Sequence, residues 1–200
     1  QYHNNQLVSF LPDSEMSQVE IYDIEKGDDG EIWLASGNGL FRYKNQTISR
    51  FTTSDGLAQD HVQRIFLDKS GGLWLCHQGR TGAIGLGLTY YDGNQFSIFT
   101  EQDGLPSNTI TSACQGNSDG VWFGTQQGLV YYDGQDFTTY NITDGLPTNK
   151  IISLFMDDQQ HLWIGTEQGI SRFVDGCFVN YSQSDSNGLI SGYINCIYQT

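Results

Sequence analysis

The chain has 200 residues, with 9 basic and 23 acidic side chains, so that its formal net charge at pH 7 is −14. This charge argues against nucleic acid as a partner, because a phosphate backbone is bound through a basic surface. It also argues against an anionic membrane surface or a highly sulfated ligand. The 11 Phe, 11 Tyr, 4 Trp and 24 Gly, with only 3 Pro, predict short strands joined by tight turns. No run approaches ~18 apolar residues, so this segment is not expected to insert into a membrane.

The repeat predicts these elements in chain order: an outer strand at 7–10, four-stranded units at 19–51, 62–99, 110–140 and 151–181, and an inner strand at 194–198. Three sequence markers recur together in the successive units and identify the internal repeat. They are one tryptophan, one Gly-Leu or Gly-Ile pair, and one Asp-Gly-Leu triplet (Asn-Gly-Leu at 187–189). The tryptophans lie 41, 48 and 41 residues apart, at Trp33, Trp74, Trp122 and Trp163. The long interval predicts an insertion within residues 80–86.

The unit at 151–181 shows the strand pattern most clearly. Its runs of strand-forming residues cover 151–156, 162–166, 170–174 and 178–181. An Asp-Gly pair at 175–176 separates the last two runs and is typical of a tight hairpin, because glycine accepts the positive φ of such turns. No segment repeats apolar residues with the period of a helix, so helices should be nearly absent.

Four antiparallel strands in about 41 residues, with one tryptophan in each unit, are typical of β-propeller blades. A blade exposes two apolar faces, and neighbouring blades bury them against one another. We therefore predict an all-β fold, with one β-propeller segment over residues 1–200 that holds four complete blades and two orphan strands. We interpret the chain as part of a larger propeller. The alternative is self-association, in which two four-blade arcs close into a ring.

Several motifs recur in the third and fourth units. They are Asp-Gly-Leu-Pro at 103–106 and 144–147, Val-Trp-Phe-Gly-Thr at 121–125, Leu-Trp-Ile-Gly-Thr at 162–166, and the Gly-Leu or Gly-Ile pair that follows. This pattern resembles the two-component regulator propeller repeat family over nearly the whole chain. The first blade is a weaker match, with Ile-Trp-Leu-Ala-Ser at 32–36, and the second carries the insertion.

The resemblance implies a seven-bladed sensor propeller, periplasmic or extracellular, in a membrane-anchored bacterial receptor such as a hybrid histidine kinase. It implies a ligand-sensing or binding segment that detects a nutrient such as an oligosaccharide. Its partners would be that ligand, the remaining blades and downstream signalling domains. We expect no enzymatic activity and no cofactor. Two alternatives stay open: a protein-interaction scaffold, and a propeller lyase or glycan hydrolase.

Propeller geometry brings the links before the first strands and the loops between second and third strands to one face, which we call the loop-bearing rim. We predict ligand contacts from residues just before the first strands: Asp60, His61, Asn108, Asn149, Lys150 and Tyr193. His77 and Arg80 fall on the same rim of blade two, where the repeat is locally broken. The alternative is that all eight are solvated loop residues.

The tryptophans open the second strand of every unit, and this fixed place favours packing between blades for Trp33, Trp74, Trp122 and Trp163. The four cysteines form no Cys-x-x-Cys pair and fit no zinc spacing, so no metal site is predicted. A disulfide between Cys76 and Cys114 stays open, because sequence does not give the distance between them.

Overall fold

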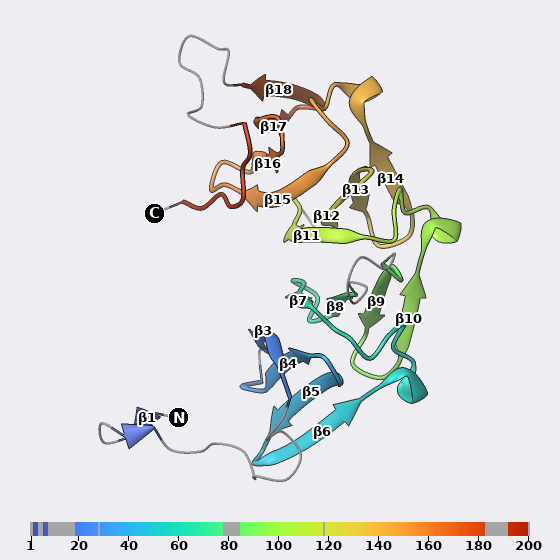
Figure 1. Ribbon diagram of the computed structural model, residues 1–200, viewed down its shortest axis with the longest axis vertical. Coiled ribbons are helices and arrows are strands. Elements are labelled where there is room, and N and C mark those ends of the chain that lie inside the picture. The colour runs from blue at the N-terminus through green and yellow to red at the C-terminus, as the bar shows by residue number, and fades with distance from the viewer. Residues whose placement is uncertain are drawn as a thin grey trace.

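The computed structural model describes residues 2–3, 6–7, 19–27, 29–77, 85–117, 119–182 and 192–199. These residues form four four-stranded antiparallel sheets and one two-stranded hairpin. The sheets fan out as an arc, with the first strand of each on the inner side and the fourth on the outer side (Figure 1). The predicted all-β propeller-type fold is confirmed, whereas the seven-bladed ring stays a prediction. The helices among the described residues are three-residue 3₁₀ turns, and none is long and apolar enough to cross a membrane.

Each blade contributes four consecutive strands to one sheet. Blade one consists of β3 (Ile21–Lys26), β4 (Ile32–Ser36), β5 (Gly39–Lys44) and β6 (Thr47–Phe51). Blade two consists of β7 (Arg64–Leu67), β8 (Leu73–Cys76), β9 (Leu88–Tyr91) and β10 (Phe96–Phe99). Blade three consists of β11 (Ile110–Gln115), β12 (Val121–Thr125), β13 (Gly128–Tyr132) and β14 (Phe137–Tyr140). Blade four consists of β15 (Ile151–Met156), β16 (Leu162–Thr166), β17 (Ile170–Val174) and β18 (Cys177–Tyr181).

The glycine of the Gly-Leu marker stands where the third strand of a blade passes the end of the fourth. Gly128 has φ +145°, and a Cβ there would lie 2.7 Å from the carbonyl oxygen of Tyr140. Gly39, Gly87 and Gly169 meet the carbonyl oxygens of Phe51, Phe99 and Tyr181 in the same way. The marker is therefore a steric requirement of the blade, because only glycine combines this φ with so close an approach.

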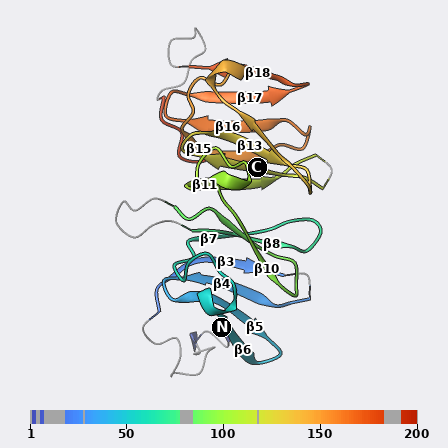
Figure 2. The ribbon, with the colours of Figure 1, turned by 90° about the vertical axis from the view of Figure 1, so that its right-hand side faces the viewer.

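The core lies between blades, in three separate clusters. At the first boundary Trp33 packs with Val62 and Leu75, at the second Trp74 packs with Ile110 and Phe123, and at the third Trp122 packs with Ile151 and Ile164. Figure 2 shows the sheets following one another in chain order from one end of the molecule to the other. Each blade is thus stabilised mainly by its neighbours, as in other repeat proteins.

The structure differs from the prediction at the two orphan strands. Of the outer strand at 7–10, Leu7 belongs to β2 (Gln6–Leu7), which pairs with β1 (Tyr2–His3), and residues 8–10 lie outside the described residues. Residues 193–199 carry no strand, which corrects the strand predicted at 194–198. In each of the four blades, the first strand pairs only with the second strand of its own blade. This sequence contains no second strand that could pair with residues 194–198.

Residues 193–199 nevertheless take the position of a first strand beside blade four. Ile194 N–H donates to the carbonyl of Thr166 at 3.0 Å, as Val62 N–H donates to the carbonyl of Ser36 at 2.9 Å. A Cβ on Gly165 would meet Cγ2 of Ile194 at 2.9 Å, as one on Gly124 would meet Cγ2 of Ile151 at 2.6 Å. The segment therefore packs as the beginning of a further blade.

Candidate functional site

On the loop-bearing rim, the Asp-Gly-Leu links fold into equivalent 3₁₀ turns: η1 (Thr53–Asp55), η3 (Glu101–Asp103) and η4 (Ile142–Asp144). In each turn the aspartate accepts a hydrogen bond of 2.8 Å from the backbone N–H three residues before it. The glycine that follows has φ between 106° and 114°, a left-handed conformation that side chains disfavour. The triplet therefore encodes a capped turn that gives each link of the rim the same shape.

Three of the predicted ligand contacts stabilise these turns. Oδ1 of Asp60, Asn108 and Asn149 accepts the first N–H of the adjacent turn, at 2.7, 2.9 and 2.9 Å. These oxygens satisfy backbone donors that a helical turn leaves without an internal partner. The three side chains therefore hold the shape of the rim, and their ligand contacts stay a prediction.

The two predicted histidines of blade two lie together. His77 is 1% exposed. Its Nε2 lies 2.8 Å from Oγ1 of Thr89, and its Nδ1 lies 3.3 Å from the carbonyl oxygen of His61. Burial lowers the pKa of His77 to about 4, so this ring is neutral at physiological pH. The ring of His61 is tilted against Tyr22 with centroids 4.9 Å apart, and its buried Nδ1 has no hydrogen-bond partner.

The remaining predicted contacts are spread along the rim. Lys150 is exposed and pairs with Glu167 at 3.1 Å, and the hydrogen bond to Glu167 raises the pKa of Lys150. Tyr193 is 51% exposed and lies close enough to Lys150 to add to that shift. Arg80 and most of the insertion predicted at 80–86 lie outside the described residues. The groups that the described rim presents are therefore the ring of His61, the amides of Asn108 and Asn149, the ion-paired Lys150 and the ring of Tyr193.

The four tryptophans pack in two different settings. Trp33, Trp74 and Trp122 are buried at blade boundaries. Trp163 is only half-buried, because no described blade covers its outer face. Nε1 of Trp74 donates to Asp68 at 2.9 Å and Nε1 of Trp163 donates to Asp157 at 2.8 Å, so two of the rings are also fixed by hydrogen bonds.

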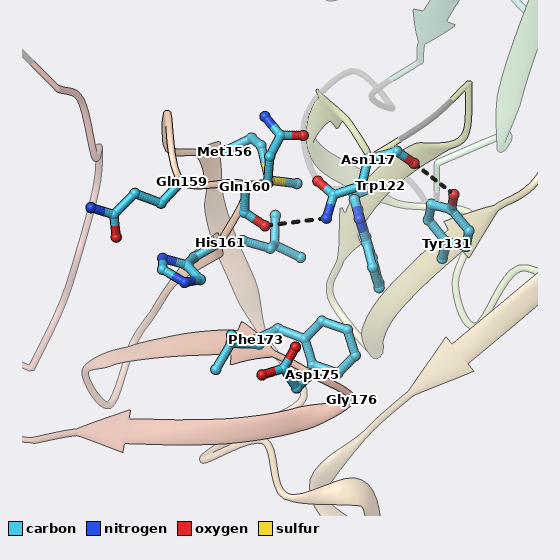
Figure 3. Close-up of a pocket in the computed structure, with 12 residues that line it drawn as sticks. Asn117, Trp122, Tyr131, Met156, Gln159, Gln160, His161, Phe173, Asp175 and Gly176 are labelled. Atoms are coloured by element: carbon cyan, nitrogen blue, oxygen red, sulfur yellow. Dashed lines mark hydrogen bonds between the residues drawn. The ribbon is translucent and has the colours of Figure 1, made fainter.

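A cavity of about 460 Å³ opens between blades three and four, on the face opposite the loop-bearing rim. We call it the interblade cavity. Blade three contributes Asn117, Trp122 and Tyr131, and blade four contributes the turn at 159–161 and the hairpin at 173–176. Figure 3 shows Trp122 of blade three facing Met156 and Phe173 of blade four. A hydrogen bond of 3.2 Å from Nδ2 of Asn117 to the carbonyl of Gln160 joins the two walls.

Sequence reasoning missed this cavity, although a local departure from the repeat marks it. His161 stands where blades two and three have Gly72 and Gly120, and Arg172 stands where they have Tyr90 and Tyr131. Nδ1 of His161 lies 3.1 Å from Oδ2 of Asp157. Burial of Asp157 raises its pKa, but hydrogen bonds from Trp163 and His161 outweigh this effect, and its pKa is lowered.

A second cavity, of about 210 Å³, lies between the first strands. It is lined by Asp23, Arg64, Ser112 and Ser153, which occupy equivalent positions in the four blades, and by Asn195. Oδ2 of Asp23 accepts the N–H of Ile65 at 3.0 Å, which ties blade one to blade two. Among the described residues, no group of three or more His, Cys, Asp or Glu could hold a metal ion. Cys76 and Cys114 are free thiols rather than a disulfide.

Comparison with known proteins places these features in a family context. Residues 104–127 and 145–168 match the family model described as two component regulator propeller. Each match runs from the glycine of a 3₁₀ turn through the second strand of blade three or blade four. The chain therefore carries repeats of the kind found in two-component regulator propellers. No curated protein matches the chain by sequence.

Solved structures share the fold. The extracellular domain of BT3049 of B. thetaiotaomicron, described as a hybrid two component system, is 24% identical over 94% of this chain and 26% of its own, with a TM-score of 0.75. The extracellular domain of BT4673 from the same organism is 19% identical over 90% of this chain and 24% of its own, with a TM-score of 0.66. An inactive virginiamycin B lyase from Staphylococcus aureus is 15% identical over 86% of this chain and 58% of its own, with a TM-score of 0.65. This chain spans about a quarter of the length of the two B. thetaiotaomicron chains.

Proposed function

We propose that this chain is the ligand-binding part of a sensor propeller, in the extracellular or periplasmic region of a membrane-anchored two-component receptor. The observation that carries the proposal is the pair of two-component regulator propeller repeats in blades three and four. The fold shared with the extracellular domains of two B. thetaiotaomicron proteins supports it. Signal transfer would then belong to domains outside this sequence, and the remaining blades would pack against blades one and four.

A neutral oligosaccharide is the ligand class that we propose for the loop-bearing rim. The rim offers amides at Asn108 and Asn149 and an aromatic hydroxyl at Tyr193, groups that hydrogen-bond sugar hydroxyls or stack on sugar rings. Its links are held by capped turns, so little ordering would oppose binding. The net charge of −14 favours a neutral or cationic ligand over a sulfated one.

We propose no catalytic role for this chain. The lyase and glycan hydrolase alternative needs a proton-transfer group that can reach a substrate, and His77 of the rim is buried with both ring nitrogens at hydrogen-bond distance from Thr89 and His61. The fold shared with virginiamycin B lyase at 15% identity concerns the scaffold alone. A protein-interaction scaffold stays the second candidate, since propellers also serve in that role.

The test is a binding screen followed by a signalling assay. We expect thermal stabilisation of the 200-residue chain by at least one member of a panel of neutral oligosaccharides. Lys150→Ala or Tyr193→Ala should reduce that stabilisation. Lys44→Ala should not, because Lys44 forms a comparable exposed ion pair with Asp29 away from the rim. In the full-length receptor the same oligosaccharide should change kinase phosphorylation.

Two results would contradict the proposal. If no oligosaccharide stabilises the chain and a protein partner does, the scaffold function is favoured. If an oligosaccharide binds but leaves phosphorylation in the full-length receptor unchanged, the propeller binds a ligand without acting as a sensor.

A further inference from the structure

The wall of the interblade cavity is aromatic. The rings of Trp122 and Tyr131 lie 4.6 Å apart between centroids, and the ring of Phe173 lies 5.4 Å from Trp122 on the other side. All three residues line the cavity. Trp122 is buried between the other two rings, whereas Tyr131 and Phe173 are half-buried and offer the surface that a ligand can contact. Aromatic faces attract cations electrostatically within about 6 Å of the ring centroid.

The charge of the cavity is negative. Its lining contains the carboxylate of Asp175 and no lysine or arginine. Figure 3 places this carboxylate beside the ring of Phe173. Within the part of the chain that the structure describes, Asp175 forms no ion pair. His161 of the lining contacts Asp157 rather than Asp175, with its Nδ1 3.1 Å from Oδ2 of Asp157.

We propose that the interblade cavity binds a cationic organic group, an ammonium or a guanidinium, between the aromatic wall and the carboxylate of Asp175. An amino sugar and a basic peptide both present such a group. The net charge of −14 would attract either one over a long range. This inference goes beyond the proposed function, because it adds a second ligand site on the face opposite the rim.

The boundary between blades two and three provides a contrast inside the same molecule. Trp74, Tyr90 and Tyr132 form a similar aromatic group there, with Trp74 4.4 Å from Tyr90 and 5.3 Å from Tyr132. The position equivalent to Asp175 is Gly134, and the position equivalent to Asn117 is Lys69. At these two positions the boundary therefore has a lysine and no carboxylate, and the adjacent Asp133 already accepts the N–H groups of Gln135 and Asp136. We expect this boundary not to bind cations.

The experiment follows the indole N–H signals of the four tryptophans by NMR while small probes are added to the 200-residue chain. The cationic probes are the glucosamine dimer and N-acetyl-glycyl-arginine amide. Each has a neutral match: the N-acetylated dimer for the sugar and N-acetyl-glycyl-citrulline amide for the peptide. We expect a cationic probe to shift the signal of Trp122 with saturation, while its neutral match does not and the Trp74 signal stays in place. Saturation by one probe alone identifies the source of the cation.

Asp175→Asn tests the role of the carboxylate. Asp175 has φ +49°, a conformation that asparagine tolerates, so the variant should fold. We expect it to weaken cation binding about twofold to fivefold, because Asp175 is exposed. Asp136→Asn removes one exposed charge from the hairpin of blade three, outside the lining, and should leave the affinity unchanged. The proposal is overturned if neutral probes bind equally well, if Asp175→Asn binds like the parent, or if no probe moves Trp122. Oligosaccharide binding at the rim would survive each of these results, so the two proposals fail separately.

Discussion

Trp122 of blade three and Phe173 of blade four stand edge to face, with ring centroids 5.4 Å apart and planes inclined by 67°. The other two boundaries repeat this relationship. Trp33 meets Tyr91 at 5.7 Å and 66°, and Trp74 meets Tyr132 at 5.3 Å and 73°. The tryptophan of each of the first three blades is thus held by the third strand of the next blade. Part of the stability of these blades therefore depends on the blade that follows.

This dependence predicts unequal effects for two equivalent substitutions. Trp122→Ala removes a ring that is packed on both sides and should lower the free energy of unfolding by ~3–5 kcal/mol. Trp163→Ala removes a ring whose outer face no described blade covers, and the loss should be clearly smaller, about 1–2 kcal/mol. Urea unfolding of both variants followed by circular dichroism measures the difference. Equal losses would contradict the packing argument.

The four cysteines should react with a thiol reagent in two groups. Burial raises the pKa of both Cys76 and Cys114 to about 12, and thiolates are the reactive form. Cys177 and Cys196 are exposed. A colorimetric thiol assay on the native chain should therefore count two fast thiols, and four only after denaturation. Fast reaction at Cys76, identified by mass spectrometry, would show that blade two opens readily.

The repeat made most of the fold predictable. The Gly-Leu glycines and the Asp-Gly-Leu turns are local steric requirements, so their spacing locates strands and links without knowledge of tertiary contacts. The strand predicted at 194–198 failed for a different reason, because a strand is defined by a neighbour and this sequence does not contain that neighbour. Its packing beside Gly165 still follows the repeat.

The candidate sites were harder to predict. Variation at Asn108 and Asn149 suggested ligand contacts, yet their oxygens hold backbone turns, a role that their side-chain type alone does not distinguish. The interblade cavity depends on turns from two blades, and Asn117 and Asp175 are 58 residues apart in the sequence. Only the blade-to-blade register brings such residues together.

The close approach of a third-strand tyrosine to a glycine in the turn before the second strand explains why some blades lack both residues. A Cβ on Gly120 would lie 2.1 Å from the hydroxyl oxygen of Tyr131, and one on Gly72 would lie equally close to that of Tyr90. Blades one and four have larger residues in the turn, Glu31 and His161, and both have arginine in place of the tyrosine, at positions 42 and 172. A blade with the tyrosine therefore needs glycine in the turn, whereas a blade with arginine at that position accommodates a larger turn residue.

A double-mutant cycle at Gly120 and Tyr131 tests this pairing. Gly120→Ala alone should destabilise the chain by about 1–3 kcal/mol through overpacking. The same change in a Tyr131→Arg background should cost much less, so the two effects should not add. Gly134→Ala is a control for the loss of glycine, since nothing lies within 4 Å of a Cβ there, although its φ of +102° carries its own strain. Additive effects in denaturant unfolding would show that ring and turn are independent.

His77 connects three backbone and side-chain groups of blade two. The carbonyl of His61 can only accept, so the proton of the neutral His77 ring resides on Nδ1 and is donated to that carbonyl. Nε2 then accepts from the hydroxyl of Thr89, whose Oγ1 in turn accepts the N–H of Ala58 at 3.1 Å. Protonation of Nε2 would place a positive charge in this buried site, so burial keeps the ring neutral.

The stability of the chain should therefore fall on mild acidification. Burial lowers the pKa of His77 from 6.5 to about 4. Between these values the unfolded chain binds a proton at His77 that the folded chain excludes, and stability rises with pH wherever the unfolded state binds more protons. The contribution is complete above pH 6.5 and is lost progressively toward pH 4, by at most about 3 kcal/mol. His77→Thr, which introduces the residue found at equivalent positions 125 and 166, should flatten the profile of unfolding free energy against pH in this window. An unchanged slope in His77→Thr would refute the assignment.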